Sequence, residues 1–330
     1  HCPLCQAARS YAWLERQQER LLPVPYFHVI FSVASELNLV VRYNREVLFQ
    51  EFFAQSSGTL QSFAQDPQWL GAQLGFLGIL HTWGQTLVFH PHIHYIVPQG
   101  GLDAAGRWVR PRLRDEARFL FPIGAVSQVF RGRFLHRLQQ LHAAGRLRFP
   151  DPLSESQFPD QLRMAAAKKW EVYAQPPLAG PDELLRYLSL YTHRTAISPG
   201  RLLECAAQSV RFRYKDYRDG GRPKTLRLGG EVFVSRFLQH VLPRGFRRLR
   251  YYGFLANAAG RHAVAELQAD GLGLLLACLG VLGRWAEAGE EAQTQEGQRP
   301  DWRPVCPFCG GGPLRRVASV RPPVRLDDTS

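Results

Sequence analysis

The sequence predicts an α+β protein in which an antiparallel sheet carries helices on one face. Strand-like and helix-like segments interleave along the 330 residues without the even rhythm of a doubly wound parallel fold. A hydrophobic share of 45% is enough to bury a large core. The longest apolar run, Leu272 to Gly283, is too short to span a membrane and is followed directly by Arg284. We therefore expect a soluble, intracellular protein.

The first half of the predicted fold alternates strands with an amphipathic helix. Tyr26 to Ala34 is aromatic and β-branched, which favours a strand, whereas Asn44 to Gln65 has helical spacing. Two further strands, within Leu70 to Gln85 and His92 to Gly101, are joined by a short connection and predict a hairpin. A short strand is expected within Arg107 to Arg112.

The middle of the chain predicts a long helix, a loop and a strand that leads into a second helix. Ile123 to Leu147 is a basic helix, and Phe149 to Asp160 is an acidic, proline-containing loop. Lys168 to Pro177 is a strand. It leads through the turn at Gly180–Pro181 into a helix over Asp182 to Arg194.

The next part of the chain predicts a hairpin followed by a basic helix. Ser209 to Gly230 alternates around an Asp-Gly-Gly-Arg-Pro turn and predicts two paired strands. Glu231 to Leu267 is interpreted as helical and very basic. Within it, Tyr251 and Tyr252 are neighbours, and on a helix their side chains point about 100° apart. We therefore expect them to pack or to stack on a bound partner, and not to act together on one group.

The charge indicates a partner that carries phosphate. The formal net charge is +13 and the isoelectric point is near 9.9, with arginine supplying almost all of the positive charge. Arginine suits bidentate phosphate contacts, and a strongly basic domain is typical of nucleic-acid binding. The alternative is a solvated basic surface or an arginine-rich genome.

A histidine cluster predicts a metal site. His90, His92 and His94 fall within five residues. His92 and His94 alternate on a predicted strand, so both imidazoles leave the same face. His81, on the preceding strand, is the expected third ligand across the hairpin, with Gln85 and His90 as alternatives. The competing interpretation is a half-exposed strand decorated with histidines. In so basic a chain, an open Mg²⁺ or Mn²⁺ site would polarise a scissile phosphate.

A pair of tyrosines is the second motif. Tyr187 and Tyr191 are four residues apart in the predicted helix, so their phenols share one face. Core packing is the competing interpretation, but leucines elsewhere in this helix can supply the buried stripe. A neighbouring metal ion or arginine would lower the pKa of a tyrosine and activate it as a nucleophile. Two tyrosines could act in succession, one linked to a DNA 5′ end while the other makes a second cut.

With both motifs in view, the sequence resembles the rolling-circle transposases of the HUH superfamily, and most closely their two-tyrosine, IS91-like insertion-sequence branch. The stretches HTWGQTLVFHPHIHYIVPQGG, GPDELLRYLSLYTHRTAIS, FRYKDYR and HVLPRGFRRLRYYGFLAN carry the resemblance, which covers roughly Leu22 to Gly260. It implies a ferredoxin-like antiparallel core with the histidine pair on a central strand and the tyrosines on an adjacent helix.

The resemblance also implies a reaction. A DNA transposase of this family nicks single-stranded DNA at transposon ends by tyrosine attack, leaving a 5′-phosphotyrosine link and a free 3′-hydroxyl. Tyr187 and Tyr191 would be the nucleophiles, and His92 and His94 the metal pair, with His81 as third ligand. Phosphate contacts are expected, although a solvated basic face would look the same, at Arg194, Arg213, Lys215, Arg247 and Arg248. We expect a cytoplasmic, nucleoid-associated bacterial enzyme.

The cysteine pairs extend the resemblance to zinc. The family carries a zinc module before its catalytic domain, and HCPLCQ resembles the end of that module. We expect a remnant of it with a linker helix over 1–21, the catalytic domain over 22–265, and a helix, linker and zinc-ribbon-like tail over 266–330. The chain begins without methionine, so we expect a piece of a longer protein. Either one joint zinc site or two incomplete sites would use Cys2, Cys5, Cys306 and Cys309.

Other functions stay open from the sequence. A plasmid relaxase or replication initiator would share the chemistry, but fused helicase or primase segments would be expected. A non-catalytic, zinc-containing DNA-binding protein would use the basic segments alone. The expected partner is single-stranded DNA at transposon ends and not a membrane, and the oligomeric state stays open between monomer and homodimer. The lone Cys205 is expected to be a small buried residue.

Overall fold

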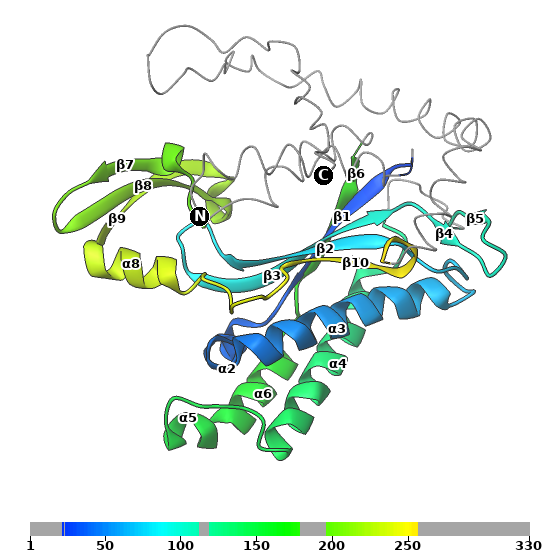
Figure 1. Ribbon diagram of the computed structural model, residues 1–330, viewed down its shortest axis with the longest axis horizontal. Helices are drawn as coiled ribbons and strands as arrows, with labels where there is room; N and C mark the ends of the chain where they lie inside the picture. Colours follow the sequence, from blue (N-terminus) through cyan, green and yellow to red (C-terminus); the bar gives the residue numbers. More distant parts are fainter. Residues whose placement is uncertain (1–21, 23, 112–118, 179–195, 257–330) are drawn as a thin grey trace, which may run out of the picture. The chain divides into compact units, whose positions relative to one another are not determined.

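One antiparallel five-stranded sheet organises the described part of the chain. A computed structural model describes residues 22, 24–111, 119–178 and 196–256 (Figure 1). The chain divides into two compact units, 1–281 and 282–330, and every described residue lies in the first. The strand order is β10–β2–β3–β1–β6. The strands are β1 (Tyr26–Ser32), β2 (Phe76–Trp83), β3 (Phe89–Pro98), β6 (Val172–Leu178) and β10 (Leu249–Tyr252).

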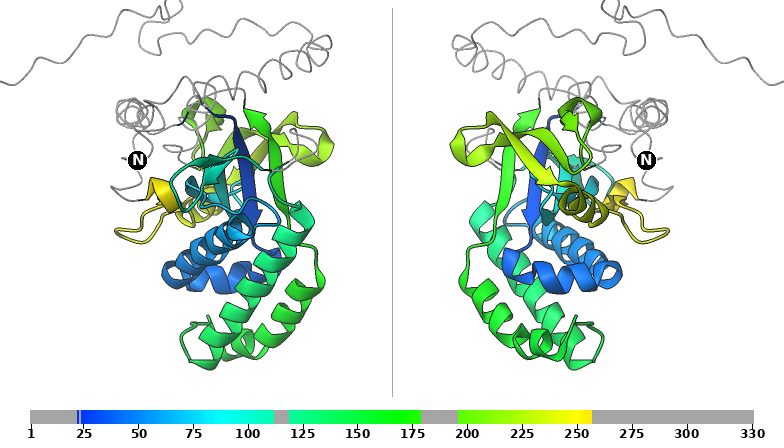
Figure 2. Two further views of the ribbon diagram at one scale, coloured as in Figure 1. Left: turned by 90° about the vertical axis from the view of Figure 1, so that its right-hand side faces the viewer. Right: turned by 90° about the vertical axis from the view of Figure 1, so that its left-hand side faces the viewer.

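A layer of helices covers one face of this sheet, as Figures 1 and 2 show for α3 and α4. The α-helices of the layer are α2 (Asn38–Tyr43), α3 (Arg45–Gln65), α4 (Ile123–Ala143), α5 (Pro152–Ser156) and α6 (Phe158–Ala167). Alternation in β1 turns Phe27, Val29 and Phe31 toward the helices, where all three are fully buried. Phe130 of α4 meets Phe31 edge to face at 5.1 Å. The predicted α+β fold with helices on one face is confirmed.

A smaller, three-stranded sheet packs against the turn between β2 and β3. It has the order β7–β8–β9 and is followed by α8. The bounds are β7 (Leu202–Cys205), β8 (Ser209–Asp216), β9 (Arg222–Gly229) and α8 (Gly230–Leu238). Leu87, at the turn, packs in a cluster with Phe212 of β8 and with Phe233 and Phe237 of α8. Its φ of 61° lies in the left-handed region, which is uncommon outside glycine.

The remaining regular elements are short. A two-stranded ribbon pairs β4 (Gly101–Leu102) with β5 (Trp108–Val109), as expected for the second of these strands. The 3₁₀ helices are η1 (Ser35–Leu37), η2 (Pro199–Arg201), η3 (Tyr217–Asp219) and η4 (Gly253–Leu255). Among the described residues, no helix has both the length and the apolar character needed to cross a bilayer.

The structure corrects the prediction of a loop over Phe149 to Asp160. Two helices, α5 and α6, begin within this stretch. Pro152 is the first residue of α5, and Pro159 lies in the first turn of α6. Proline is tolerated there because the N–H groups of the first turn have no partner within the helix. The prolines therefore mark helix starts, not a loop.

The predicted helix over Glu231 to Leu267 is confirmed as far as Leu238, the end of α8, and is wrong for the described residues beyond it. After α8 the chain passes Pro243 and Gly245, whose φ is +75°, and then forms β10 at the edge of the main sheet. Tyr251 and Tyr252 therefore point to opposite faces instead of about 100° apart. Tyr252 stacks on Phe76 with ring centroids 5.0 Å apart, and burial raises the pKa of its phenol to about 12. Packing is the role that the structure supports for Tyr252.

One smaller expectation is overturned, and several fall outside the described residues. Cys205 is exposed at the end of β7 rather than buried. The expected helix over 182–194, the N-terminal and C-terminal elements and the proposed zinc ligands Cys2, Cys5, Cys306 and Cys309 lie outside the described residues.

Candidate metal centre

The hairpin of β2 and β3 brings three histidines to the sheet face opposite the helices. His81 pairs directly with His92, and His94 lies two residues further along β3. Because side chains alternate along a strand, His92 and His94 share a face, while Ile93 and Tyr95 between and beside them enter the helix-side core. The predicted hairpin and the predicted meeting of His81 with His92 and His94 are both found.

The imidazoles of His81, His92 and His94, called the triad below, form a compact group of possible nitrogen ligands. One ligand nitrogen from each ring can be chosen so that all three lie within 4.8 Å of one another. The ring centroid of His94 is 4.5 Å from that of His81 and 4.8 Å from that of His92. Since nitrogen ligands sit about 2.1 Å from a bound ion, two of them lie at most about 4.2 Å apart. The spacing of the three nitrogens is therefore close to the spacing that one shared ion requires.

Neighbouring groups decide which nitrogen of each ring faces the cluster. The Nδ1–H of His92 donates to the carbonyl oxygen of His90 at 2.8 Å, which leaves its Nε2 as the ligand atom. Nδ1 of His94 is 2.7 Å from Nε2 of His28, so Nε2 of His94 is its ligand atom. His81 stacks on Trp83 with ring centroids 4.7 Å apart. The donor set fits a divalent ion held by imidazole nitrogens.

Burial keeps these imidazoles in the form that binds metals. Desolvation lowers the pKa of His92 to about 4 and that of His94 well below its ordinary value. Desolvation also lowers the pKa of His28 to about 4. Near neutral pH these rings are uncharged, and an uncharged imidazole offers the lone pair that a metal ligand needs.

The same burial predicts a loss of stability in acid. His240 is a buried histidine outside the triad, and desolvation lowers its pKa to about 4 from the ordinary 6.5. The unfolded chain binds its proton near pH 6.5 but the folded chain only near pH 4, so stability is fully present above pH 6.5 and falls as the pH drops toward 4. The contribution is up to about 1.4 kcal/mol per pH unit in this window.

We expect His240→Gln to flatten the pH dependence of unfolding between pH 6.5 and 4, as measured by urea titration at a series of pH values. His142→Gln is the matched control, because the same substitution is made at a histidine of α4 whose side chain is 32% exposed. Equal slopes for wild type and His240→Gln would contradict the expectation.

The alternative third ligands are not part of the triad. Gln85 lies in the β2–β3 turn, and its side-chain oxygen accepts from the backbone N–H of Lys215 at 3.4 Å. His90 lies beside His92 on the same strand, but the group of three that could share an ion is formed by His81, His92 and His94.

The remaining predicted site residues divide into two sets. Tyr187, Tyr191 and Arg194 lie outside the described residues. Arg213 and Lys215 are exposed on β8, and Arg247 is exposed before β10. Arg248 is half-buried, and desolvation lowers the pKa of its guanidinium.

Sequence reasoning missed His28 and Gln175, which join the histidines from the other side. His28 lies on β1 and is 1% exposed, and its Nδ1 is 2.9 Å from the side-chain oxygen of Gln175 on β6. The signal was present, because a lone histidine stands in the predicted strand 26–34. Finding its partner required the strand order, which places β1 between β3 and β6.

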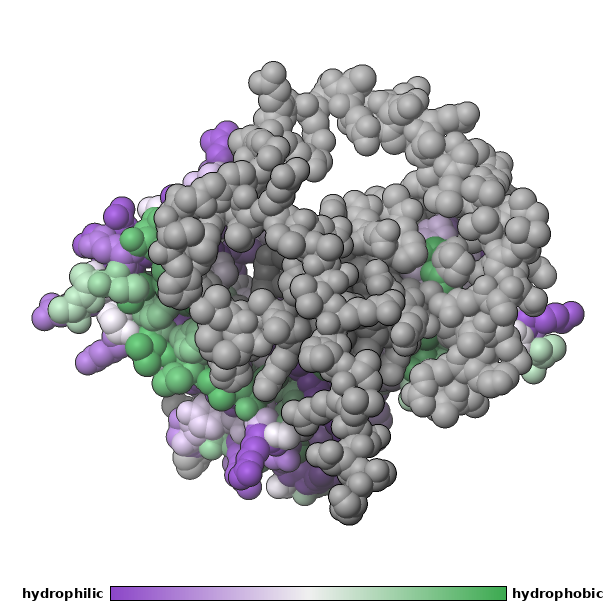
Figure 3. Space-filling model, turned by 45° about the horizontal axis from the view of Figure 1, so that its top comes forward, coloured by the Kyte–Doolittle hydropathy of each residue, from purple (hydrophilic) through white to green (hydrophobic). Residues whose placement is uncertain are grey.

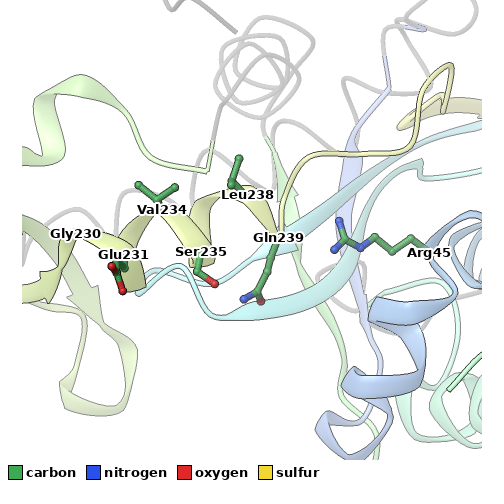
Figure 4. A pocket seen from close by; sticks show the side chains of 7 residues that line it. All are labelled: Arg45, Gly230, Glu231, Val234, Ser235, Leu238 and Gln239. Atoms are coloured by element: carbon green, nitrogen blue, oxygen red, sulfur yellow. The ribbon is translucent and has the colours of Figure 1, made fainter. Parts of the chain in front are cut away.

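A cavity on α8 lies apart from this chemistry. It has a volume of about 640 Å³ and is lined by Arg45 and by residues of or beside α8. In Figure 4, Val234 and Leu238 project from one side of the helix and Ser235 and Gln239 from another. None of the three histidines lines it. The chemistry of the donor set, not the size of a cavity, identifies the candidate site.

Comparisons with known proteins agree with the resemblance. Residues 75–262 match the family described as "Putative transposase", and residues 1–33 match a transposase zinc-binding domain of the IS91 type. "Putative transposase y4qJ" of Sinorhizobium fredii is 36% identical over 345 aligned positions, which cover 100% of this chain and 83% of that protein.

A second relative is more distant. "Transposase for insertion sequence element IS801" of Pseudomonas savastanoi pv. phaseolicola is 29% identical over 262 aligned positions, which cover 78% of this chain and 60% of that protein. No solved structure matches the chain.

Proposed function

This chain belongs to the IS91-like family of transposases, and we propose that it nicks and rejoins single-stranded DNA at the ends of an insertion sequence through a 5′-phosphotyrosine intermediate, for rolling-circle transposition. The observation that carries this proposal is the meeting of His81, His92 and His94 on the sheet face opposite the helices. The nucleophiles proposed are Tyr187 and Tyr191.

The chain positions on either side of the tyrosines support their place in this reaction. Residues 179–195 follow β6, which carries Gln175. Gln175 lies within hydrogen-bond distance of His28, and His28 lies within hydrogen-bond distance of His94. The segment 179–195, which contains both tyrosines, thus follows a strand whose Gln175 is connected to His94 through His28.

The other end of the segment returns to the same hairpin. Ala196 is buried in the cluster around Leu87, and Trp83 packs against that cluster while it stacks on His81. Tyr191 is five residues before Ala196. The described residues before and after this segment therefore lie on the strand next to β1 and in the cluster at the β2–β3 turn, which supports the proposal that Tyr187 and Tyr191 act at the histidines.

The proposed chemistry exchanges one ester for another. The phenol of one tyrosine loses its proton and attacks phosphorus, the new P–O bond joins tyrosine to the 5′ end, and the 3′-oxygen leaves and takes up a proton. Attack by a 3′-hydroxyl on the phosphotyrosine reverses the step and rejoins DNA. An Mg²⁺ or Mn²⁺ ion held by the triad would supply charge stabilisation at the phosphate. His81, His92 and His94 would hold the ion through their ring nitrogens, and strands β2 and β3 fix the orientation of these rings.

A basic face on the smaller sheet supports single-stranded DNA as the partner. Along β8, Arg211, Arg213 and Lys215 are exposed and alternate with Phe212, which is fully buried. Glu204 neutralises part of this charge through its ion pair with Arg211. Figure 3 shows hydrophilic side chains projecting at the left of the view, the end that β7, β8 and β9 form in Figure 1.

The basic face is attached to the metal hairpin. The backbone of Lys215 donates to the side chain of Gln85, and Arg201 donates to the carbonyl of the same residue. Gln85 lies in the turn between the strands that carry His81 and His92. A phosphate backbone bound along β8 would therefore continue toward the metal centre.

Charge reversal on this face should weaken DNA binding. We expect Arg213→Glu with Lys215→Glu to lower affinity for single-stranded element ends about tenfold or more at moderate salt. The slope of log K against log salt should fall by roughly 1.4, since each phosphate contact on a single strand contributes about 0.7. Fluorescence anisotropy at several salt concentrations measures both quantities.

The matched control reverses two cations in the helical layer, Arg133→Glu with Arg146→Glu, which changes the net charge equally. Both are exposed, on and just after α4. If the control weakens DNA binding as much as the β8 variant, net charge rather than this face explains the effect.

The N-terminal cysteines extend the proposal to zinc. Cys2 and Cys5 lie in the region that matches the transposase zinc-binding domain. We propose zinc at this pair, completed either by Cys306 and Cys309 or by ligands outside this sequence. Zinc content per chain, compared with that of a Cys306→Ser/Cys309→Ser variant, separates the two arrangements.

A single assay tests the proposed reaction. Wild-type protein is incubated with labelled single-stranded DNA from the element ends and Mn²⁺, and the products are separated under denaturing conditions. A covalent protein–DNA adduct with a free 3′-hydroxyl on the released fragment is the expected result. A protein that binds the DNA without any adduct would instead be the non-catalytic DNA-binding protein.

A further inference from the structure

Three side chains in hydrogen-bond contact connect β6, through β1, to the β2–β3 hairpin that carries the triad. Gln175, His28 and His94 are connected at 2.9 Å and 2.7 Å, and the second contact joins Nε2 of His28 to Nδ1 of His94. His28 is 1% exposed and His94 is 5% exposed. His28 and His94 are not cross-strand partners, since His28 pairs with Ile96 and His94 pairs with Ile30. The contact is therefore a diagonal one between neighbouring strands.

The two imidazoles are aligned for a hydrogen bond in the plane of both rings. Their planes differ by 1° and their centroids are 5.0 Å apart. With the facing nitrogens only 2.7 Å apart, this separation fits two rings placed end to end in a common plane rather than one above the other. An imidazole N–H and an imidazole lone pair both lie in the ring plane, so this alignment suits a strong bond.

The proton on each nitrogen follows from Gln175. Its side-chain oxygen can only accept, so Nδ1 of His28 donates to it. A neutral imidazole carries one N–H, so Nε2 of His28 accepts from Nδ1–H of His94. Nε2 of His94 then bears a lone pair on the side of the ring away from His28.

We propose that His28 and Gln175 are positioning residues that hold His94 in the Nδ1–H tautomer and so present its Nε2 to the metal. This inference rests on the proposed metal centre, but it assigns a role to residues outside the triad. Gln175 sets the direction of both hydrogen bonds. A donor in place of its oxygen would reverse the two bonds and put the proton of His94 on Nε2, the proposed ligand nitrogen. Outer partners of metal-bound histidines act in this way in general.

The first test measures metal affinity without turnover. Mn²⁺ binding to the full chain is followed by electron paramagnetic resonance. We expect His28→Phe, which keeps the ring but has no acceptor, to weaken binding roughly 10- to 100-fold. His28→Gln should restore much of the affinity, because its side-chain oxygen can accept from His94. Gln175→Glu, which can only accept, should bind at least as tightly as wild type.

The second test reads the tautomer directly in metal-free protein. Long-range ¹⁵N–¹H correlation spectra of ¹⁵N-histidine-labelled protein, with His94 assigned by its loss in His94→Ala, should show Nδ1–H at His94 in wild type. In His28→Phe the Nε2–H form should become populated. His142→Phe, a histidine-to-phenylalanine change on α4, is the matched control and should alter neither the tautomer nor Mn²⁺ affinity.

The outcomes separate this inference from the proposed function. If wild type binds Mn²⁺ and His94→Ala does not, the metal centre stands, and unchanged affinity and tautomer in a folded His28→Phe would overturn the role of His28. If wild type and His94→Ala bind Mn²⁺ equally weakly, the metal centre itself fails, and the inference fails with it. Tight binding by His28→Phe with an unaltered melting temperature is the clearest contrary result.

Discussion

His94→Ala is expected to lower the rate of single-strand nicking by about 10³-fold or more and to abolish tight Mn²⁺ binding. His94 lies nearest to both other rings, with centroids 4.5 Å from His81 and 4.8 Å from His92, whereas the centroids of His81 and His92 are 5.5 Å apart. Metal charge stabilisation of a phosphoryl transition state is worth several kcal/mol, and about 4 kcal/mol corresponds to 10³ in rate. Single-turnover adduct formation and Mn²⁺ titration measure the two effects.

His90→Ala is the matched control for this prediction. His90 adjoins the triad and its backbone carbonyl accepts from His92, but an alanine keeps that carbonyl. The variant should therefore retain Mn²⁺ affinity to within a few-fold. A loss as large as that of His94→Ala would mean that His90 is a ligand and that the triad is assigned incorrectly.

The double variant Tyr187→Phe/Tyr191→Phe is expected to form no covalent adduct while it binds single-stranded DNA within about twofold of wild type. Phenylalanine keeps the ring but lacks the oxygen that forms the bond to phosphorus. DNA binding is expected to persist because the basic face on β8 is unchanged. A denaturing gel measures the adduct, and anisotropy measures binding on the same samples.

A described tyrosine offers a sharp control. Tyr173 on β6 is 55% exposed on the histidine face, and it pairs with Ile30, which in turn pairs with His94. Tyr173→Phe should leave the adduct unchanged. If Tyr173→Phe loses the adduct and the double variant keeps it, the nucleophile is Tyr173 and the proposed pair is wrong.

The single tyrosine variants carry further information. If the two phenols act in succession, Tyr187→Phe and Tyr191→Phe should each retain one cleavage and lose strand exchange between two ends. Equal and complete loss in both single variants would indicate one nucleophile with a supporting neighbour.

Much of the sheet could be predicted because its strands have local signatures. Aromatic and β-branched residues over 26–34 predicted that strand, and alternation along the histidine hairpin predicted the shared face of His92 and His94. The edge strand β10 could not be read in this way, since its four residues follow a basic stretch with helical spacing. Pro243 and Gly245 were the available signal for the break. Pairing with β2, which is remote in sequence, stabilises the strand.

The triad was predictable for the same local reason, and its surroundings were not. His81 and His92 face each other across one hairpin, so counting residues along two strands was sufficient. His28 and Gln175 reach His94 only because β1 and β6 lie side by side in the sheet. Such an order depends on packing of the whole core and has no signature in any single segment.

The β2–β3 hairpin also has a consequence for the folding of the protein and for the evolution of its sequence. His92 lies eleven positions after His81, so the entropy lost in closing this loop is small, and the three histidines can come together as soon as two adjacent strands pair. The basic strand β8 comes more than a hundred residues later. Substitutions on β8 can therefore alter the proposed DNA contacts while the sequence of the hairpin that carries the proposed metal ligands stays unchanged.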